Sequence, residues 1–291
     1  MDILEIFKAI ILGIIQGITE WLPISSTGHM LLFNSFFPLN YNIYSGNVEF
    51  AELFMTVVQL ASTLAVILLF FKKLNPFSSS KSLKERRKTF SLWGKVIIGS
   101  IPVMIVGFML KNAIHKYLYN GFVIALMLIL YGLFFITVES FRDDKKSVAI
   151  SNLGQISMQT AFLIGIFQAL ALIPGTSRSG ATILGALLIG CSRSVGAEFS
   201  FFLAIPAMVG ASTLEIVSYF KNNGMGFSAN EFCVLGVGFV VSFIVSIFVV
   251  SIFMKFIKTH DFKGFAWYRI ALGIVIIGVF SVGSLNMGVH F

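Results

Sequence analysis

The sequence is poor in charged residues, and this scarcity excludes an ordinary water-soluble protein. Asp, Glu, Lys and Arg make up 12% of its 291 residues, compared with roughly 25% in soluble domains. Apolar residues make up 57%, and the mean hydropathy is +0.91. We therefore expect an all-α integral membrane protein that is surrounded largely by lipid.

Cysteine is also scarce, because the chain contains only Cys191 and Cys233, far apart in apolar surroundings. This favours packing roles over a disulfide. The N-terminus lacks a basic cluster and a small-residue cleavage site, so we do not interpret it as a removable signal peptide. The net charge of +8 sits in short loops between apolar runs, which is typical of membrane topology and argues against nucleic acid as a partner.

Several apolar runs are long enough to cross the hydrocarbon core, which takes about 20 residues. They lie near residues 52–71, 91–110, 120–139, 197–220, 231–254 and 268–288. Most of the 21 Lys and Arg residues fall in loops on one side, and segment 72–95 is the richest of these. The positive-inside rule then places this segment in the cytoplasm and both termini outside.

Two further apolar regions, 9–37 and 155–190, are interrupted by polar residues. Each pattern predicts a short helix, a polar break and another short helix. Non-helical backbone inside a membrane is tolerated only where it is buried in protein or faces a watery cavity. We therefore expect both regions to be re-entrant hairpins.

The two interrupted regions resemble each other in sequence. Gln16–Gly28 reads QGITEWLPISSTG and Gln168–Gly180 reads QALALIPGTSRSG. Shorter matches follow each of them, again about 150 residues apart. This predicts one polytopic domain made of two repeats, about 1–145 and about 150–291, each a hairpin plus three transmembrane helices. Because three crossings are an odd number, the second repeat is expected to be inverted, and the two polar tips can meet near the midplane.

The first break carries a candidate acid–base and nucleophilic cluster. Glu20 lies four residues after Gln16, on the same helix face, and a carboxylate inside a membrane indicates a functional site. The hydroxyl and glycine run Ser25–Gly28 follows, where a new helix would direct its positive end at an anion. His29 can transfer a proton near neutral pH.

The second break, Pro174–Gly180, is the more specific anion site. Arg178 keeps its charge, and its planar guanidinium suits phosphate. Two glycines and three hydroxyl side chains around it resemble an anion-binding nest. A purely structural ion pair between Arg178 and Glu20 is the alternative. Glu198 and Glu215 are expected at interfacial or structural positions.

These motifs resemble the undecaprenyl-diphosphatase family, bacterial enzymes linked to bacitracin resistance. That family has a Glu/Gln-x-x-x-Glu motif running into Ser-Ser-Thr-Gly-His, matched here by Gln16–His29, and a Pro-Gly-x-Ser-Arg-Ser-Gly motif, matched by Pro174–Gly180. The arrangement of spans is similar over nearly the whole chain. Many members have Glu where this chain has Gln16, which weakens any metal site made of two carboxylates there.

The resemblance implies an enzyme that hydrolyses undecaprenyl diphosphate to undecaprenyl phosphate and inorganic phosphate, recycling the lipid carrier of cell-wall synthesis. It also implies a homodimer in the bacterial cell membrane, with an active site open to the outside. The expected catalytic residues are Glu20, Ser26, His29 and Arg178. The expected phosphate-binding residues are Gln16, Ser25, Thr27, Gly28, Gly175, Thr176, Ser177, Ser179 and Gly180.

Several alternatives remain at this point. Glu20 is either a general base or a ligand of Mg²⁺ or Ca²⁺, and either Ser26 or a water attacks the phosphate. A lipid-phosphate transporter or flippase is the main rival function, because broken helices in inverted repeats are typical of transporters. A second class of membrane lipid phosphatase is disfavoured, since it needs a His after its Ser-Arg segment and none follows Arg178 before His260.

Overall fold

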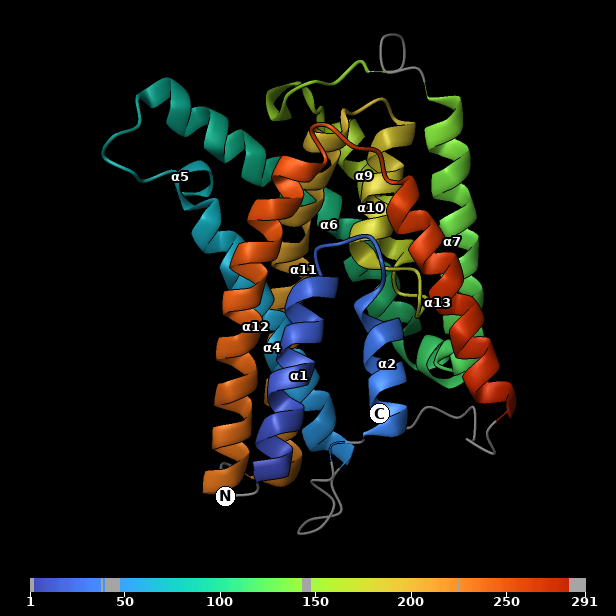
Figure 1. The fold of residues 1–291 in the computed structure, drawn as a ribbon. Coiled ribbons are helices and arrows are strands. Elements are labelled where there is room, and N and C mark those ends of the chain that lie inside the picture. Colours follow the sequence, from blue (N-terminus) through green and yellow to red (C-terminus); the bar gives the residue numbers. More distant parts are fainter. Residues whose placement is uncertain (1–2, 38, 40–47, 143–147, 225, 283–291) are drawn as a thin grey trace.

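The protein is almost entirely helical in the computed structural model, which describes residues 3–37, 39, 48–142, 148–224 and 226–282 (Figure 1). The elements in chain order are α1 (Ile3–Thr19), α2 (Ser26–Phe36), α4 (Val48–Leu69), α5 (Phe71–Leu74), α6 (Leu83–Leu118), α7 (Gly121–Phe141), the 3₁₀ helix η1 (Leu153–Gln155), α9 (Met158–Leu170), α10 (Arg178–Leu188), α11 (Arg193–Asn223), α12 (Ala229–Phe256) and α13 (Lys263–Val282).

Within the described residues, 6 helices are long and apolar enough to cross a membrane, namely α4, α6, α7, α11, α12 and α13. They coincide with the expected spans, and their ends differ by several residues. The largest difference is α6, which begins at Leu83 because Ser82 and Glu85 form a capping box. This pattern confirms the prediction of an all-α membrane protein.

The remaining short helices form two pairs, each interrupted at the expected polar break. α1 ends at Thr19 and α2 begins at Ser26, while α9 ends at Leu170 and α10 begins at Arg178. In Figure 1, α1 and α2 occupy the lower half of the bundle and α9 and α10 the upper half. The two breaks therefore approach each other in the middle of the molecule.

The second helix of each pair begins with the same local geometry. Ser25 and Ser177 have φ angles of 69° and 67° and are the non-glycine residues with positive φ among those described. The Ser25 hydroxyl accepts a hydrogen bond from the amide of Gly28 at 3.4 Å, and that of Ser177 from the amide of Gly180 at 3.2 Å. Left-handed backbone is uncommon for residues other than glycine. Its occurrence at matching positions shows that the two breaks share the same local backbone structure.

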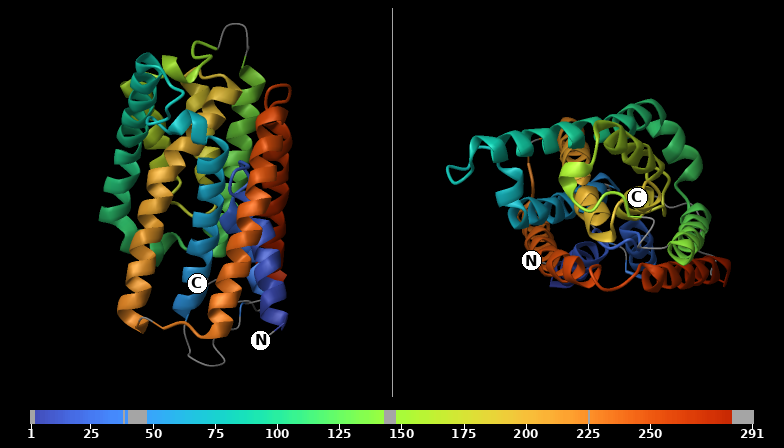
Figure 2. Two further views of the ribbon diagram at one scale, coloured as in Figure 1. Left: turned by 90° about the vertical axis from the view of Figure 1, so that its left-hand side faces the viewer. Right: turned by 90° about the horizontal axis from the view of Figure 1, so that it is seen from above.

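The first helix of each pair packs against a long helix from the opposite half of the sequence. α1 lies along α12, and α9 lies along α6. Glycines permit both close approaches: a Cβ atom at Gly13 would lie 3.0 Å from the carbonyl oxygen of Gly238, and one at Gly165 would lie 2.0 Å from that of Gly99. The two halves are therefore interlocked, and Figure 2 shows the long helices flanking the short pairs.

The two cysteines are free thiols, as expected. Cys191 lies in the short connection between α10 and α11, where burial raises the pKa of its thiol to about 11. A thiol held in its protonated form is a poor nucleophile, which agrees with a packing role.

Candidate active site

Glu20 lies at the centre of the polar cluster formed by the first break. Its Oε2 atom accepts hydrogen bonds from Gln16 Nε2 at 2.8 Å and from the Ser26 hydroxyl at 3.0 Å. The residue is 5% exposed. The expected pairing of Gln16 and Glu20 on one helix face is thus present, and it positions the carboxylate beside a hydroxyl that could act as a nucleophile.

The second break brings Arg178 to the same carboxylate. Arg178 Nη2 donates to Glu20 Oε1 at 3.1 Å, and Nη1 donates to the Ser200 carbonyl oxygen of α11 at 3.0 Å. Its guanidinium carbon lies 5.1 Å from the centre of the Trp21 ring, which is a cation–π distance. The two breaks therefore meet through an ion pair between residues from opposite halves of the chain.

Ser179 strengthens this junction from the α10 side. Its hydroxyl lies 3.1 Å from the backbone oxygen of Glu20 and 3.0 Å from that of Leu22, so it donates to the backbone of the first break. Ser177 is partly exposed, and its hydroxyl lies 3.2 Å from that of Ser179. Of these two hydroxyl groups, the one on Ser177 is thus better placed to meet an incoming ligand.

Arg269 of α13 forms hydrogen bonds with the backbone of both breaks, and sequence analysis did not assign it to the site. This fully buried side chain donates to the backbone oxygens of Pro23 at 3.0 Å, Gly175 at 3.1 Å and Thr176 at 3.0 Å. Gly175 has a φ of +89°, and a Cβ atom there would lie 2.4 Å from the carbonyl oxygen of Ile124. This close packing against α7 explains the glycine.

The expected phosphate-binding residues differ in accessibility. Ser26 and Thr27 are partly exposed, whereas Ser25 and Thr176 are buried. The Thr176 hydroxyl has no hydrogen-bond partner among the described residues, and Gly28 and Gly180 are buried at the starts of their helices. Contact of each of these residues with phosphate remains a prediction.

His29 contacts α13. Its Nδ1 atom lies 2.7 Å from the carbonyl oxygen of Ser25, and its Nε2 atom lies 2.7 Å from the hydroxyl oxygen of Tyr268. Both ring nitrogens therefore have partners. Tyr268 is a second contributor from α13 that sequence analysis missed.

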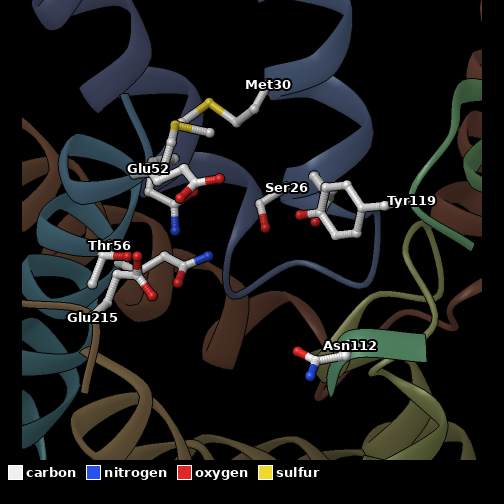
Figure 3. A pocket seen from close by; sticks show the side chains of 11 residues that line it. Ser26, Met30, Glu52, Thr56, Asn112, Tyr119 and Glu215 are labelled. Carbon is white, nitrogen blue, oxygen red and sulfur yellow. The ribbon is translucent and has the colours of Figure 1, made fainter. Parts of the chain in front are cut away.

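A cavity of about 530 Å³ opens in front of this cluster (Figure 3). It is lined by Gln16, Ser26, Thr27, Met30, Glu52, Met55, Thr56, Gln59, Asn112, Tyr119 and Glu215. In Figure 3, Glu52, Thr56 and Glu215 lie together on one side of Ser26 and Tyr119 lies on the other. Glu215, expected at an interfacial or structural position, thus lies on the cavity wall.

The oxygen-rich wall suits a hard divalent cation only in part. Among the described residues, no group of three or more His, Cys, Asp and Glu side chains is arranged to hold a metal ion. Both oxygens of Glu20 already have hydrogen-bond partners. Mg²⁺ is often held by one or two carboxylates plus substrate phosphates, and the cavity carboxylates Glu52 and Glu215 fit that arrangement.

Known proteins resemble the chain over nearly its whole length. The family model described as bacitracin resistance protein BacA matches residues 9–275. Undecaprenyl-diphosphatase 1 of Clostridioides difficile is 50% identical over 279 residues, covering 96% of this chain and 97% of the relative. The undecaprenyl-diphosphatases of Desulfitobacterium hafniense and Enterococcus faecalis are 46% and 47% identical, with coverage of 97–99% of each chain. The chain therefore belongs to the bacitracin resistance protein BacA family.

Proposed function

We propose that this protein is an undecaprenyl-diphosphate phosphatase, which releases inorganic phosphate from the diphosphate and returns the monophosphate carrier to cell-wall synthesis. Relatives that match almost end to end carry the name undecaprenyl-diphosphatase. The family model that matches residues 9–275 is described as bacitracin resistance protein BacA. The membrane-spanning helices give a C55 lipid tail apolar surfaces along which to lie.

The contact between Ser26 and Glu20 carries the mechanistic proposal. In it, the Ser26 hydroxyl loses its proton to Glu20 Oε2, 3.0 Å away, and attacks the terminal phosphorus. The bond from that phosphorus to the bridging oxygen breaks, and undecaprenyl phosphate leaves. Arg178 would neutralise charge on the phosphoryl oxygens, and the Ser177 and Thr27 hydroxyls would donate hydrogen bonds to them. Phosphoryl transfer depends mainly on such positioning and charge stabilisation.

A second step would restore the enzyme. Water attacks the phosphoserine at Ser26, the serine oxygen regains a proton, and inorganic phosphate is released. His29 would give or accept a proton in this cycle. Direct attack by a water that Glu20 activates is the alternative, and it would leave no phosphoserine.

The decisive experiment measures phosphate release from undecaprenyl diphosphate by purified protein. Glu20→Ala and Arg178→Ala should each lose on the order of 10²-fold or more in rate, and near-normal turnover in both would refute the assignment. Single-turnover reactions quenched with acid at successive times distinguish the nucleophiles, because only the covalent route passes through a phosphoserine. Phosphoserine at Ser26 supports covalent catalysis, whereas its absence at every quench time supports direct attack by water.

We propose that a divalent cation, Mg²⁺ or Ca²⁺, assists the reaction. The carboxylates of Glu52 and Glu215 would hold it together with substrate oxygens, and Glu20 is a further candidate ligand. The ion would supply positive charge to the diphosphate. Chelation with EDTA should then lower phosphate release, and re-addition of each cation separately would identify the one that restores it.

We further propose that repeats 1–145 and 150–291 have inverted topology and that both helix pairs are re-entrant. The matching serine caps, the equal lengths of α2 and α10, and the reciprocal packing of α1 on α12 and of α9 on α6 support this. In this proposed topology, the cavity would open to the outer face of the cell membrane and segment 72–95 would be cytoplasmic. Single cysteines placed at 80 and 120 should react with impermeant reagents only from the inside and only from the outside, respectively.

Two parts of the proposal have separate tests. The expected homodimer should appear as twice the chain mass in native mass spectrometry from detergent.

The rival function, lipid-phosphate flipping, is favoured by the broken helices that meet inside the bundle. Translocation of the lipid in liposomes by the hydrolysis-deficient Glu20→Ala variant would support flipping, whereas translocation that requires hydrolysis would count against it.

A further inference from the structure

Tyr268 forms a hydrogen bond with His29. Among the described histidines, His29 is the one that lies in a motif of the proposed site. The Tyr268 hydroxyl oxygen lies 2.7 Å from His29 Nε2, and the rings are stacked with centroids 5.5 Å apart and planes inclined by 8°. The two residues are 239 positions apart in the sequence. Such a contact needs the folded arrangement of α2 and α13.

The hydrogen bonds define the state of the imidazole ring. Because a carbonyl oxygen can only accept, the 2.7 Å contact of His29 Nδ1 with Ser25 places a proton on Nδ1. Nε2 of the neutral ring is then an acceptor, and the Tyr268 hydroxyl is its donor. The Tyr268 contact is therefore directed at the single basic atom of His29.

The surroundings hold the backbones of both residues in place, although Tyr268 itself is 47% exposed. α2 is seated closely on its neighbours, since a Cβ atom at Gly28 would lie 3.1 Å from Leu128 Cδ1. Beside Tyr268, Arg269 is fully buried and bound to backbone oxygens of both breaks. The backbone that carries Tyr268 is thus tied to the same two breaks that hold Glu20 and Arg178, which favours a preorganised pair.

We propose that Tyr268 is a positioning residue for turnover, which fixes the tautomer and ring orientation of His29. The proposal rests on the proposed function, in which His29 transfers a proton. A structural pair that only joins α2 to α13 would make the same contact, so the test must separate chemistry from packing.

The test compares Tyr268→Phe, which removes only the hydroxyl, with Trp267→Phe on the adjacent, exposed position of α13. Tyr268→Phe should lower kcat about 10-fold with KM within about two-fold, as expected for one lost positioning hydrogen bond. It should also move the limb of the pH–rate profile that reports the imidazole by about half a pH unit or more. Trp267→Phe should leave both unchanged.

A double variant makes the test specific to His29. In the His29→Ala background, Tyr268→Phe should cause little further loss, because residues that act as a unit are not additive. An equal loss in both backgrounds, a change in KM alone, or a kcat unaffected by Tyr268→Phe would overturn the proposal, as would full activity of His29→Ala. Failure of the wild-type protein to release phosphate would instead refute the proposed function itself.

Discussion

Arg178 donates to Glu20 at 3.1 Å across a separation of 158 residues, and this ion pair joins the two polar breaks. Its members come from opposite halves of the chain, so neither half contains a complete site. The side chains are 13% and 4% exposed. When one partner of such a largely buried pair is removed, the other is left as a costly unpaired charge.

Replacement of Glu20 by Gln should strongly slow turnover while preserving the shape of the site. The amide can still hydrogen-bond but is a poor proton acceptor, so phosphate release should fall on the order of 10²-fold or more. Glu198→Gln is the matched control, because Glu198 is also buried and pairs with a cation, Lys73, but lies outside the two polar breaks. Equal losses in the two variants would show that any carboxylate deletion is harmful and would remove the case for Glu20 as a base.

Replacement of Arg178 by Lys should also inactivate the protein, although the charge is retained. A lysine ammonium lacks the planar fork with which Arg178 contacts both Glu20 and the Ser200 carbonyl. We expect a rate loss of about 10²-fold, measured as phosphate release at saturating substrate. Arg193→Lys, which alters the ion pair with Glu139, should retain activity far better. Comparable rates for the two variants would contradict the proposed role of the guanidinium.

Arg269→Met should destabilise the protein as well as lower its activity. The change leaves the carbonyl oxygens of Pro23, Gly175 and Thr176 without their donor. A buried polar group that loses its partner costs about 1–3 kcal/mol, so the free energy of unfolding should fall by about 3 kcal/mol or more. Denaturant unfolding in a mild detergent measures this change. A stability equal to that of the wild type would show that Arg269 does not stabilise the two breaks.

Gly165→Ala should force α9 away from α6. A Cβ atom there would lie 2.0 Å from the backbone oxygen of Gly99, so the helices must separate. We expect a destabilisation of about 1–3 kcal/mol and a lower rate, because α9 leads into the break that carries Arg178. Gly236→Ala is the control, since no atom lies within 4 Å of its added methyl group. Thermal unfolding of both variants should show a lower midpoint for Gly165→Ala only.

The sequence predicted the parts of the site that depend on local spacing. Gln16 and Glu20 share a helix face because they are four residues apart, and the breaks follow from polar residues inside apolar runs. The α13 contributions could not be found in this way. Tyr268 and Arg269 lie in a regular apolar helix with no motif around them, and they reach the breaks only through tertiary packing. Glu215 was missed for the same reason, since helix periodicity does not say which face borders a cavity.

The packing of α1 against α12 has a consequence for the order in which the protein can assemble. The ribosome makes α1 and α2 first, but the helix against which α1 rests is among the last to be synthesised. Arg269, which donates to Pro23 from 246 residues further along the chain, arrives later still. The nascent α1–α2 pair must therefore wait in the membrane or at the translocon with Glu20 lacking its ionic partner Arg178. Shielding that carboxylate until the second half is inserted is a task for the insertion machinery or for early contacts with α4.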